Sequence, residues 1–305
     1  MSVIVFGSIN MDLVARVDRL PEAGETLTGS GFTSEPGGKG ANQAVASARL
    51  DAPTRMIGAV GDDVFGARLR DTLCAEGVDI SGVTTASGQP SGLAIIAINA
   101  VAENTIIIIP GANATLGAAA LAALEPALAS AQVLLLQLEI PLDAVIAAAQ
   151  AARRRGVMVI LDPAPARPLP ADLYATINVL TPNETEAAAL VGFPIQDRAD
   201  AERAAEILIG RGAGNVILKM GSRGVYWTNG QIRQFFPAFA VDAVDTVAAG
   251  DVFNGGLAAA LSAAQHMPEA IRWGLAAGAL AVTKPGAQAA MPTRDQLLAL
   301  LERQT

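Results

Sequence analysis

Cysteine, histidine and aromatic residues are scarce in this sequence of 305 residues. Cys74 is the one cysteine, so no internal disulfide bond can form. His266 is the one histidine, so a metal site built from several histidines is excluded. A Ser-His or Cys-His catalytic pair would depend on His266, which we instead expect to be an exposed residue at a helix end. Aromatic residues make up only 4%, so Ala, Val, Ile and Leu must fill the core.

Long apolar runs are also absent, although the mean hydropathy is +0.39. The apolar stretch at residues 116–136 is broken by Glu125, Pro126 and Gln132, whereas a membrane crossing needs about 20 uninterrupted apolar residues. Residues 1–7 lack the basic leader of an export signal. We therefore expect a soluble, cytoplasmic protein that has no membrane partner.

Positive charge is in short supply as well. Lys and Arg number 21 against 29 Asp and Glu, which gives a net charge of −8. An acidic surface repels a phosphate backbone, so we expect no nucleic-acid partner. Hydrophobic residues make up 51% and charged residues 16%, a composition that indicates a large buried core and excludes a disordered chain.

Short runs rich in Val, Ile and Leu alternate with Ala-rich helical segments, which predicts an α/β fold. Runs that are apolar on both faces are typical of a parallel sheet covered on both sides. Right-handed crossovers then predict a doubly wound, mostly parallel sheet with helices on both faces. The predicted strands are Val3–Phe6, Val133–Leu138, Val157–Leu161, Ile177–Leu180 and Val216–Lys219. The predicted helices are Gly40–Leu50, Asp63–Glu76, Leu142–Arg154, Ala199–Arg211 and Asp251–Ala264.

Two regions do not follow that alternation. Leu13–Val17 and Glu25–Ser34 indicate short strands, and Gly92–Asn99 with Asn104–Ile109 indicates a hairpin. We expect residues 1–305 to form one domain, with a small β-sheet lid built from about residues 13–34 and 92–109. The apolar run at residues 106–109 would need cover on both faces, which predicts a homodimer formed through the lid.

The segment Asp245–Gly256 carries the clearest chemical signal. Ala248, Ala249 and Gly250 leave the backbone bare before a predicted helix, so an anion could approach their N–H groups and the positive end of the helix dipole. Asp251 follows and could accept the proton of an attacking hydroxyl, as phosphoryl transfer to an alcohol requires. An aspartate that merely caps an ordinary helix explains the motif equally well.

The glycine-rich segment Glu35–Ala44 lets a ligand lie close to the backbone. It is not a P-loop, because Gly40 follows Lys39 where Ser or Thr is needed, and the chain contains no dinucleotide fingerprint, which counts against a dehydrogenase. A glycine turn that caps a helix is the alternative. Asn42 and Gln43 on the first helical turn favour a site for a polar ligand.

Three further segments follow predicted strands, where open α/β sheets bind ligands. Asn10 and Asp12 could bind neighbouring hydroxyls of a sugar, with Glu139 at the same sheet edge, although a plain Asx turn is the more frequent explanation. Asn183 and Glu186 could orient a hydrated Mg²⁺, and a capping box is the alternative. The segment Lys219–Gly224 could lie along nucleotide phosphates or form a simple hairpin turn.

Together these motifs resemble the phosphofructokinase-B family of carbohydrate kinases, from Val3 to about Pro292. Gly37–Gln43 and Asp245–Asp251 are similar to the two signatures of the family, and Gly111–Ala114 and Asp162–Ala166 add to the likeness. The resemblance implies ATP-dependent phosphorylation of D-ribose at its 5-hydroxyl, with Mg²⁺ and K⁺ as cofactors.

The resemblance also implies a role for each matching residue. Asp251 would be the base, and the N–H groups of Ala248, Ala249 and Gly250 would form the anion hole. The sugar would be held by Asn10, Asp12, Gly38, Lys39, Gly40, Asn42 and Glu139. ATP would meet Asn183, Lys219, Gly221, Ser222, Gly224 and Gly250, and Asn183 with Glu186 would serve Mg²⁺ indirectly. K⁺ would be bound by Asp245, Val247, Ala281, Lys284, Gly286 and Ala290.

The sequence departs from the family pattern at five of these or neighbouring positions, namely Met11, Lys219, Val252, Leu275 and Ala290. Met11 replaces a smaller residue beside the sugar, so deoxyribose, another sugar or a nucleoside stays an alternative acceptor. Lys219 stands where Thr is common, and Leu275 stands where a polar residue often faces adenine. A sugar sensor without catalytic activity is the alternative from a different class, although binding alone does not require a base.

Overall fold

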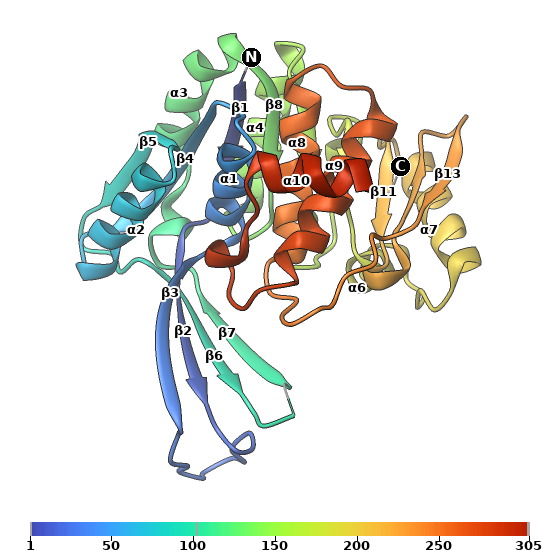
Figure 1. Ribbon diagram of the computed structural model, residues 1–305. Helices are drawn as coiled ribbons and strands as arrows, with labels where there is room; N and C mark the ends of the chain where they lie inside the picture. Colours follow the sequence, from blue (N-terminus) through green and yellow to red (C-terminus); the bar gives the residue numbers. More distant parts are fainter. Residues whose placement is uncertain (1, 102, 304–305) are drawn as a thin grey trace.

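The computed structural model describes residues 2–101 and 103–303, and Figure 1 shows their arrangement. A central sheet of nine strands is built from β1 Ser2–Phe6, β4 Thr54–Gly61, β5 Asp79–Ala86, β8 Ala131–Leu136, β9 Met158–Leu161, β10 Val179–Leu180, β11 Val216–Lys219, β12 Val225–Thr228 and β13 Arg233–Phe236. The strand order is β13-β12-β11-β10-β9-β8-β1-β4-β5. From β11 to β5 all neighbours are parallel, and β12 and β13 are antiparallel additions at one edge.

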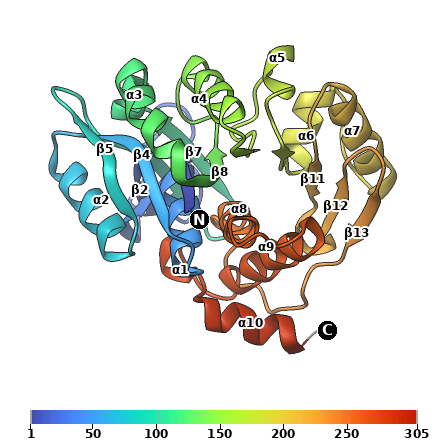
Figure 2. The ribbon, with the colours of Figure 1, turned by 90° about the horizontal axis from the view of Figure 1, so that it is seen from above.

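Helices cover both faces of this sheet (Figure 2). One face carries α1 Lys39–Arg49, α2 Val64–Ala75, α8 Ala249–Ser262, α9 Met267–Ala281 and α10 Arg294–Arg303. The other carries α3 Ala118–Ala127, α4 Leu142–Arg154, α5 Ala171–Tyr174, α6 Glu184–Val191 and α7 Arg198–Gly210. Short 3-10 turns lie at Gly111–Thr115, Leu128–Ser130, Gly221–Arg223 and Gln288–Ala290.

Alternate residues of each strand enter two separate hydrophobic cores. In β1, Val5 packs into the core under α1, α8 and α9, whereas Phe6 packs into the core under α3 and α4. Both side chains are fully buried, as a parallel sheet with two covered faces requires. The predicted doubly wound α/β fold is therefore confirmed. No helix within residues 2–101 and 103–303 is long and apolar enough to cross a membrane.

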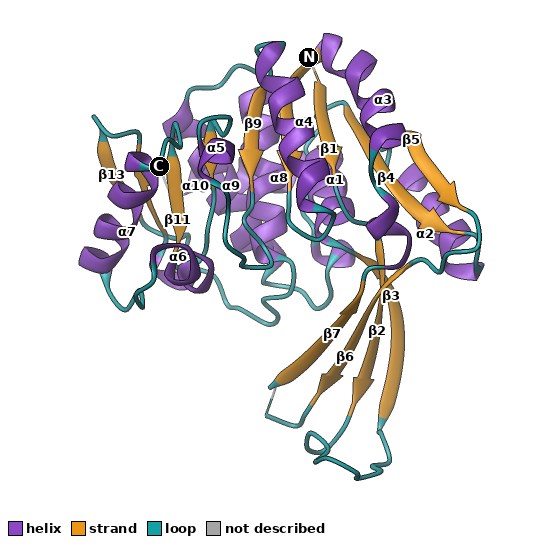
Figure 3. Ribbon diagram, turned by 180° about the vertical axis from the view of Figure 1, so that it is seen from behind, coloured by secondary structure: helices purple, strands orange, loops and turns teal. Residues whose placement is uncertain are grey.

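A second, smaller sheet stands away from the main body (Figure 3). Its strands are β2 Asn10–Arg16, β3 Gly31–Gly37, β6 Gly92–Ile98 and β7 Asn104–Ile109, in the order β3-β2-β6-β7. The hairpin of β6 and β7 lies where the sequence predicted it. The predicted strand Glu25–Ser34 is wrong over residues 25–30, because β3 begins only at Gly31. The Glu25 carboxylate instead accepts the N–H of Glu22 and pairs with Arg19, which closes a turn.

His266 is exposed and lies at a helix end, as the sequence predicted. Its Nδ1 accepts the N–H of Glu269 at 3.3 Å, so it caps the start of α9. A second cap shows how the sequence sets helix starts. Asp63 precedes α2 and its carboxylate accepts the N–H of Gly66 at 2.8 Å, which satisfies one of the free donors of the first turn.

Candidate active site

The polar segments singled out in the sequence meet at one edge of the central sheet. Strands β11, β10, β9, β8 and β1 are neighbours, and their carboxyl ends share that edge. Residues 7–10 follow β1, residues 137–139 follow β8, Asp162 follows β9 and Asn183 follows β10, while Lys219 ends β11. The parallel fold therefore gathers residues from segments that lie far apart in the chain, from the end of β1 to the end of β11.

Helix α8 begins at this edge. Its N-cap is Ala248, in the left-handed conformation with φ 58°, so Asp251 lies within the first helical turn and is not the cap. The N–H of Ala249 donates to the Thr246 carbonyl at 3.3 Å. The N–H groups of Ala248, Gly250 and Asp251 have no acceptor among the described residues. Three free donors at the positive end of a helix form a binding place for an anion.

The carboxylate of Asp251 is buried and fixed on both sides. Its Oδ2 accepts from Asn42 Nδ2 at 3.0 Å, and its Oδ1 accepts from Gln43 Nε2 at 3.1 Å. Burial raises the pKa of Asp251, the positive charge of Lys39 opposes this, and the negative charge of Asp162 adds to it. A carboxyl group whose pKa is raised towards neutrality is a stronger base than an exposed one.

Gln43 links Asp251 to a buried ion pair between Lys219, which the sequence predicted to meet ATP, and Asp162, to which the sequence assigned no role in the site. Its Nε2 also donates to Asp162 Oδ2 at 3.1 Å, and its Oε1 accepts from Gln137 Nε2 at 2.6 Å. Asp162 Oδ1 pairs with Lys219 Nζ at 3.1 Å. A Cβ atom on Gly250 would lie 3.3 Å from that Nζ, so the Lys219 ammonium group stands beside the start of α8.

A second polar cluster surrounds Glu139. One oxygen, Oε2, accepts from Ser8 Oγ at 2.6 Å, from the backbone N–H of Lys39 at 3.2 Å and from Asn10 Nδ2 at 3.3 Å. Asn10 Oδ1 in turn accepts from Asn113 Nδ2 at 2.7 Å. These bonds orient a carboxylate and an amide towards the end of β1 before any ligand arrives.

Glycines allow the start of α1 to lie against the β1–β2 turn. Gly38 has φ 88°, and a Cβ atom there would lie 2.6 Å from the backbone nitrogen of Asn10. A Cβ atom on Gly40 would lie 2.7 Å from the backbone nitrogen of Ser8. Any side chain at either position would push the two turns apart, so the glycine-rich motif is needed for close approach of the backbone.

Asp12 on β2 lies near the same cluster. Burial raises its pKa to about 7, and the negative charges of Glu139, Asp251 and Glu35 add to the effect. Lys39 faces the same carboxylates. Burial opposes its charge, but the charges of Asp251, Asp162 and other carboxylates outweigh burial and raise its pKa. The site therefore concentrates negative charge around the ammonium group of Lys39.

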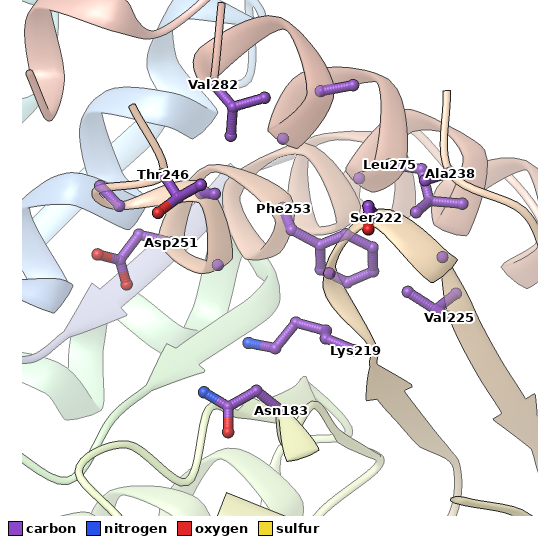
Figure 4. A pocket seen from close by; sticks show the side chains of 18 of the residues that line it. Asn183, Lys219, Ser222, Val225, Ala238, Thr246, Asp251, Phe253, Leu275 and Val282 are labelled. Atoms are coloured by element: carbon purple, nitrogen blue, oxygen red, sulfur yellow. The ribbon is translucent and has the colours of Figure 1, made fainter. Parts of the chain in front are cut away.

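A cavity of about 730 Å³ opens on the other side of Asp251 (Figure 4). Asp251 reaches it from α8, and Lys219 and Asn183 reach it from the strand ends opposite. All residues predicted to meet ATP line it, namely Asn183, Lys219, Gly221, Ser222, Gly224 and Gly250. Lys39 lines it as well. The other residues predicted to hold the sugar, Asn10, Asp12, Gly38, Gly40, Asn42 and Glu139, are not among its lining residues.

Asn183 and Glu186 form a complete capping box at the start of α6. Asn183 Oδ1 accepts the N–H of Glu186 at 2.8 Å, and the Glu186 carboxylate accepts from the N–H and the Nδ2 of Asn183 at 2.8 and 2.9 Å. Burial, and then the charge of Asp162, raises the pKa of Glu186. Both residues also line the cavity, so the cap and a role towards a ligand are compatible.

The predicted cation ligands lie in the loop before α8 and in the loop after α9. The Asp245 carboxylate joins the two loops by hydrogen bonds. Its Oδ1 accepts the N–H of Val247 at 3.0 Å and its Oδ2 accepts the N–H of Gly286 at 2.9 Å. Ala281, at the end of α9, has a carbonyl that accepts the N–H of Lys284. The carbonyls of Val247, Lys284, Gly286 and Ala290 accept no backbone N–H within the described part of the chain.

The arrangement can activate a hydroxyl and receive a phosphoryl group. A buried carboxylate lies beside free helix N–H groups, with polar side chains on one side and a cavity large enough for a nucleotide on the other. These are the requirements of a kinase that acts on a small polar alcohol.

The comparisons with known proteins agree with that class. Residues 1–294 match the pfkB family of carbohydrate kinases, and the chain belongs to this family. A ribokinase of Haemophilus influenzae is 42% identical over 98% of this chain and 97% of its own length. A deoxyribokinase of Salmonella typhimurium is 35% identical over 97% of each chain. The structure of Arabidopsis thaliana ribokinase complexed with ribose and ATP has a TM-score of 0.91 at 33% identity, covering 99% of this chain and 98% of that one.

Proposed function

We propose that this chain transfers the γ-phosphoryl group of ATP to the 5-hydroxyl of D-ribose. The observation that carries the proposal is the position of Asp251, a buried carboxylate between the polar cluster and the cavity and beside three free N–H groups. The ribokinase relatives support ribose as the acceptor and ATP as the donor.

In this mechanism Asp251 takes the proton of the 5-hydroxyl as the oxygen attacks the γ-phosphorus, and the bond between the γ-phosphorus and its bridging oxygen breaks so that ADP leaves. The free N–H groups at the start of α8 receive the charge that develops on the phosphoryl oxygens. Lys219 and Lys39 add positive charge on the cavity side. The rigid amides of Asn42 and Gln43 hold the Asp251 carboxylate in one orientation, so little rearrangement is needed during transfer.

The sugar is proposed to lie against Asn10, Asp12, Gly38, Lys39, Gly40, Asn42 and Glu139. Carboxylates accept hydrogen bonds from sugar hydroxyls, and the close approach of the two glycine turns keeps the backbone within reach. The small sheet of β2, β3, β6 and β7 is proposed to close over the sugar and exclude water, which would compete as an acceptor.

Asn183 and Glu186 are proposed to orient a hydrated Mg²⁺ on the phosphates. Acceptor oxygens at the cavity wall fit an ion that keeps its waters, and no group of three or more His, Cys, Asp or Glu residues in the described ranges could hold a metal directly. When bound, Mg²⁺ would neutralise phosphate charge.

A monovalent cation, K⁺, is proposed beside the anion-binding helix end. The donor set fits it, because the four free carbonyls and the Asp245 carboxylate are hard oxygen ligands. Such an ion would add positive charge near the start of α8. We expect higher turnover in K⁺ than in Na⁺, and equal rates in both salts would contradict the assignment.

The small sheet is also proposed to form a homodimer. Ile106, Ile107, Ile108 and Ile109 on β7 are between 37% and 56% exposed, which is unusual for four consecutive apolar residues. Sedimentation of the wild type and of Ile107→Lys tests this. A dimer that the substitution dissociates supports the interface, and a wild-type monomer at micromolar concentration overturns it.

Deoxyribose is the second candidate acceptor, because deoxyribokinases are among the relatives and Met11 is fully buried beside Asn10 and Asp12. ADP release measured across ribose, deoxyribose, hexoses and nucleosides, with and without K⁺, distinguishes the candidates. Highest kcat/KM with ribose supports the proposal. Ribose binding without any ADP formed would favour a sensor. A cytoplasmic location, where ATP is available, follows from the same proposal.

A further inference from the structure

Gln288 connects the predicted cation loop with the proposed catalytic base. It lies in the 3-10 turn Gln288–Ala290 and is only 7% exposed. Its Nε2 donates to Asn42 Oδ1 at 3.2 Å, and Asn42 Nδ2 donates to Asp251 Oδ2 at 3.0 Å. Two hydrogen bonds thus lead from the loop to the carboxylate.

Chemistry fixes the direction of these bonds. An ionised Asp251 can only accept hydrogen bonds, so Asn42 must present its amide nitrogen to it. The oxygen of Asn42 then faces Gln288, which must donate. If this donor is removed, the Asn42 amide keeps only one of these two restraints, so it holds the Asp251 carboxylate less firmly.

The oxygen of the Gln288 side-chain amide also indicates that the donor is what matters at this position. Gln288 Oε1 is buried and has no hydrogen-bond partner among the described residues. A buried acceptor without a partner destabilises the fold, so an apolar side chain of the same length would be the better choice for packing alone. What the glutamine supplies is its donor.

We propose that Gln288 is a positioning residue that holds Asp251 in its reactive orientation through Asn42. The catalytic meaning of this inference rests on the proposed kinase function. The segment has its own anchor on α1, because Arg49 Nη1 donates to the Met291 carbonyl at 2.9 Å. Replacing Gln288 therefore breaks the relay without releasing the loop.

The test compares the wild type with Gln288→Met, which has a similar length but no donor, and with Gln231→Met, an exposed glutamine, as the control. NMR titration of the Asp251 carboxyl, assigned with Asp251→Asn, requires no activity. We expect Gln288→Met to raise the pKa of Asp251, because a bond to the charged form is weakened. The charged groups that face Asp251, namely Lys39, Asp162 and Asp12, are unchanged in this variant.

In kinetics we expect kcat to fall about 10- to 10²-fold, with a smaller change in KM for the sugar. The acid limb of the kcat profile should move to higher pH, and the melting temperature should stay near that of the wild type. An unchanged titration in Gln288→Met overturns the relay. So does a loss of kcat that is accompanied by a lower melting temperature and an unmoved pH profile. A shifted titration in a chain that phosphorylates no sugar leaves the relay standing and removes the proposed function instead.

Discussion

The two sides of Asp251 are built in different ways. On the β1 side, amides and carboxylates hold one another in a continuous network through Asn10, Asn113 and Glu139. On the cavity side, the wall beyond Lys219 consists largely of small and apolar residues, among them Phe239, Val241, Ala279, Leu275 and Val282.

This contrast indicates which side of Asp251 should select most strongly between similar ligands. A network of buried polar groups rejects a ligand that leaves any of them unpaired, so we expect the proposed sugar site to discriminate strongly between similar sugars. An apolar wall selects by shape and area, and a lost contact there costs little. We therefore expect substitutions at the base and the network to affect the reaction far more than substitutions in the outer cavity.

The largest effect is expected at the boundary between the two sides. Asp251→Asn keeps the shape of the side chain and removes the base, so kcat should fall on the order of 10²- to 10⁴-fold. Steady-state ADP release at saturating sugar and ATP measures this loss. Asp242→Asn, an exposed neighbour outside the cavity lining, is the control. Near-normal turnover of Asp251→Asn would show that another group accepts the proton.

The next largest effect is expected on the cavity side, at Lys219, which lines the cavity beside Asp251 and pairs with Asp162. Lys219→Met removes the ammonium group that pairs with Asp162 and stands beside Gly250. A hydrogen bond to a charged group contributes about 1.5–3 kcal/mol, so we expect kcat/KM for ATP to fall about 10- to 10²-fold.

A matched variant separates contact from charge balance. Asp162→Asn leaves the Lys219 ammonium group in place and removes only the negative charge of its partner. This variant should retain more activity than Lys219→Met. The reverse order would mean that Lys219 serves only to balance the charge of Asp162.

Asp12 provides a pH test of the polar side. Because its pKa is about 7, the carboxyl becomes charged, and a full acceptor for sugar hydroxyls, as the pH rises from 6 to 8. KM for the sugar should therefore fall over this range, by up to about tenfold per pH unit below the pKa. Asp12→Asn should bind more weakly, with a KM that does not change with pH.

The same group has an opposite effect on stability. Its pKa is higher in the folded chain than the ordinary value of 3.8, so folding favours the protonated form. Its contribution to the free energy of unfolding is present below pH 4 and is lost as the pH rises to about 7. Asp12→Asn should raise the melting temperature at pH 8 but not at pH 4. A variant that melts lower at pH 8 would contradict this account.

The sequence predicted the sheet, its flanking helices and the edge at which polar residues gather, because apolar runs and glycine turns depend on local patterns. Predicted helix Leu142–Arg154 matches α4 residue for residue, whereas only two residues of the predicted strand Ile177–Leu180 pair. The sequence does not predict side-chain hydrogen bonds between segments that are far apart in the chain. The position of Gln43 on the first helical turn indicates a polar site, but its bonds to Asp162 and Asp251 depend on packing between elements more than 100 residues apart. The free N–H of Asp251 likewise depends on where α8 begins.

The smallest effect is expected at the outer wall of the cavity. Leu275 is 8% exposed and lines the cavity together with Phe253, and on the proposed function we expect it to contact the base of the nucleotide. Leu275→Ala removes apolar contact there, and we expect KM for ATP to rise several-fold, because the loss of one CH₂ group's worth of ligand contact, about 0.8 kcal/mol, corresponds to about fourfold. The kcat and the KM for the sugar should not change, because no hydrogen bond of the network involves this residue. Initial rates at varied ATP and saturating sugar measure the effect. A loss of kcat comparable to that of Lys219→Met would show that the wall positions the phosphates, and the contrast between the two sides would then fail.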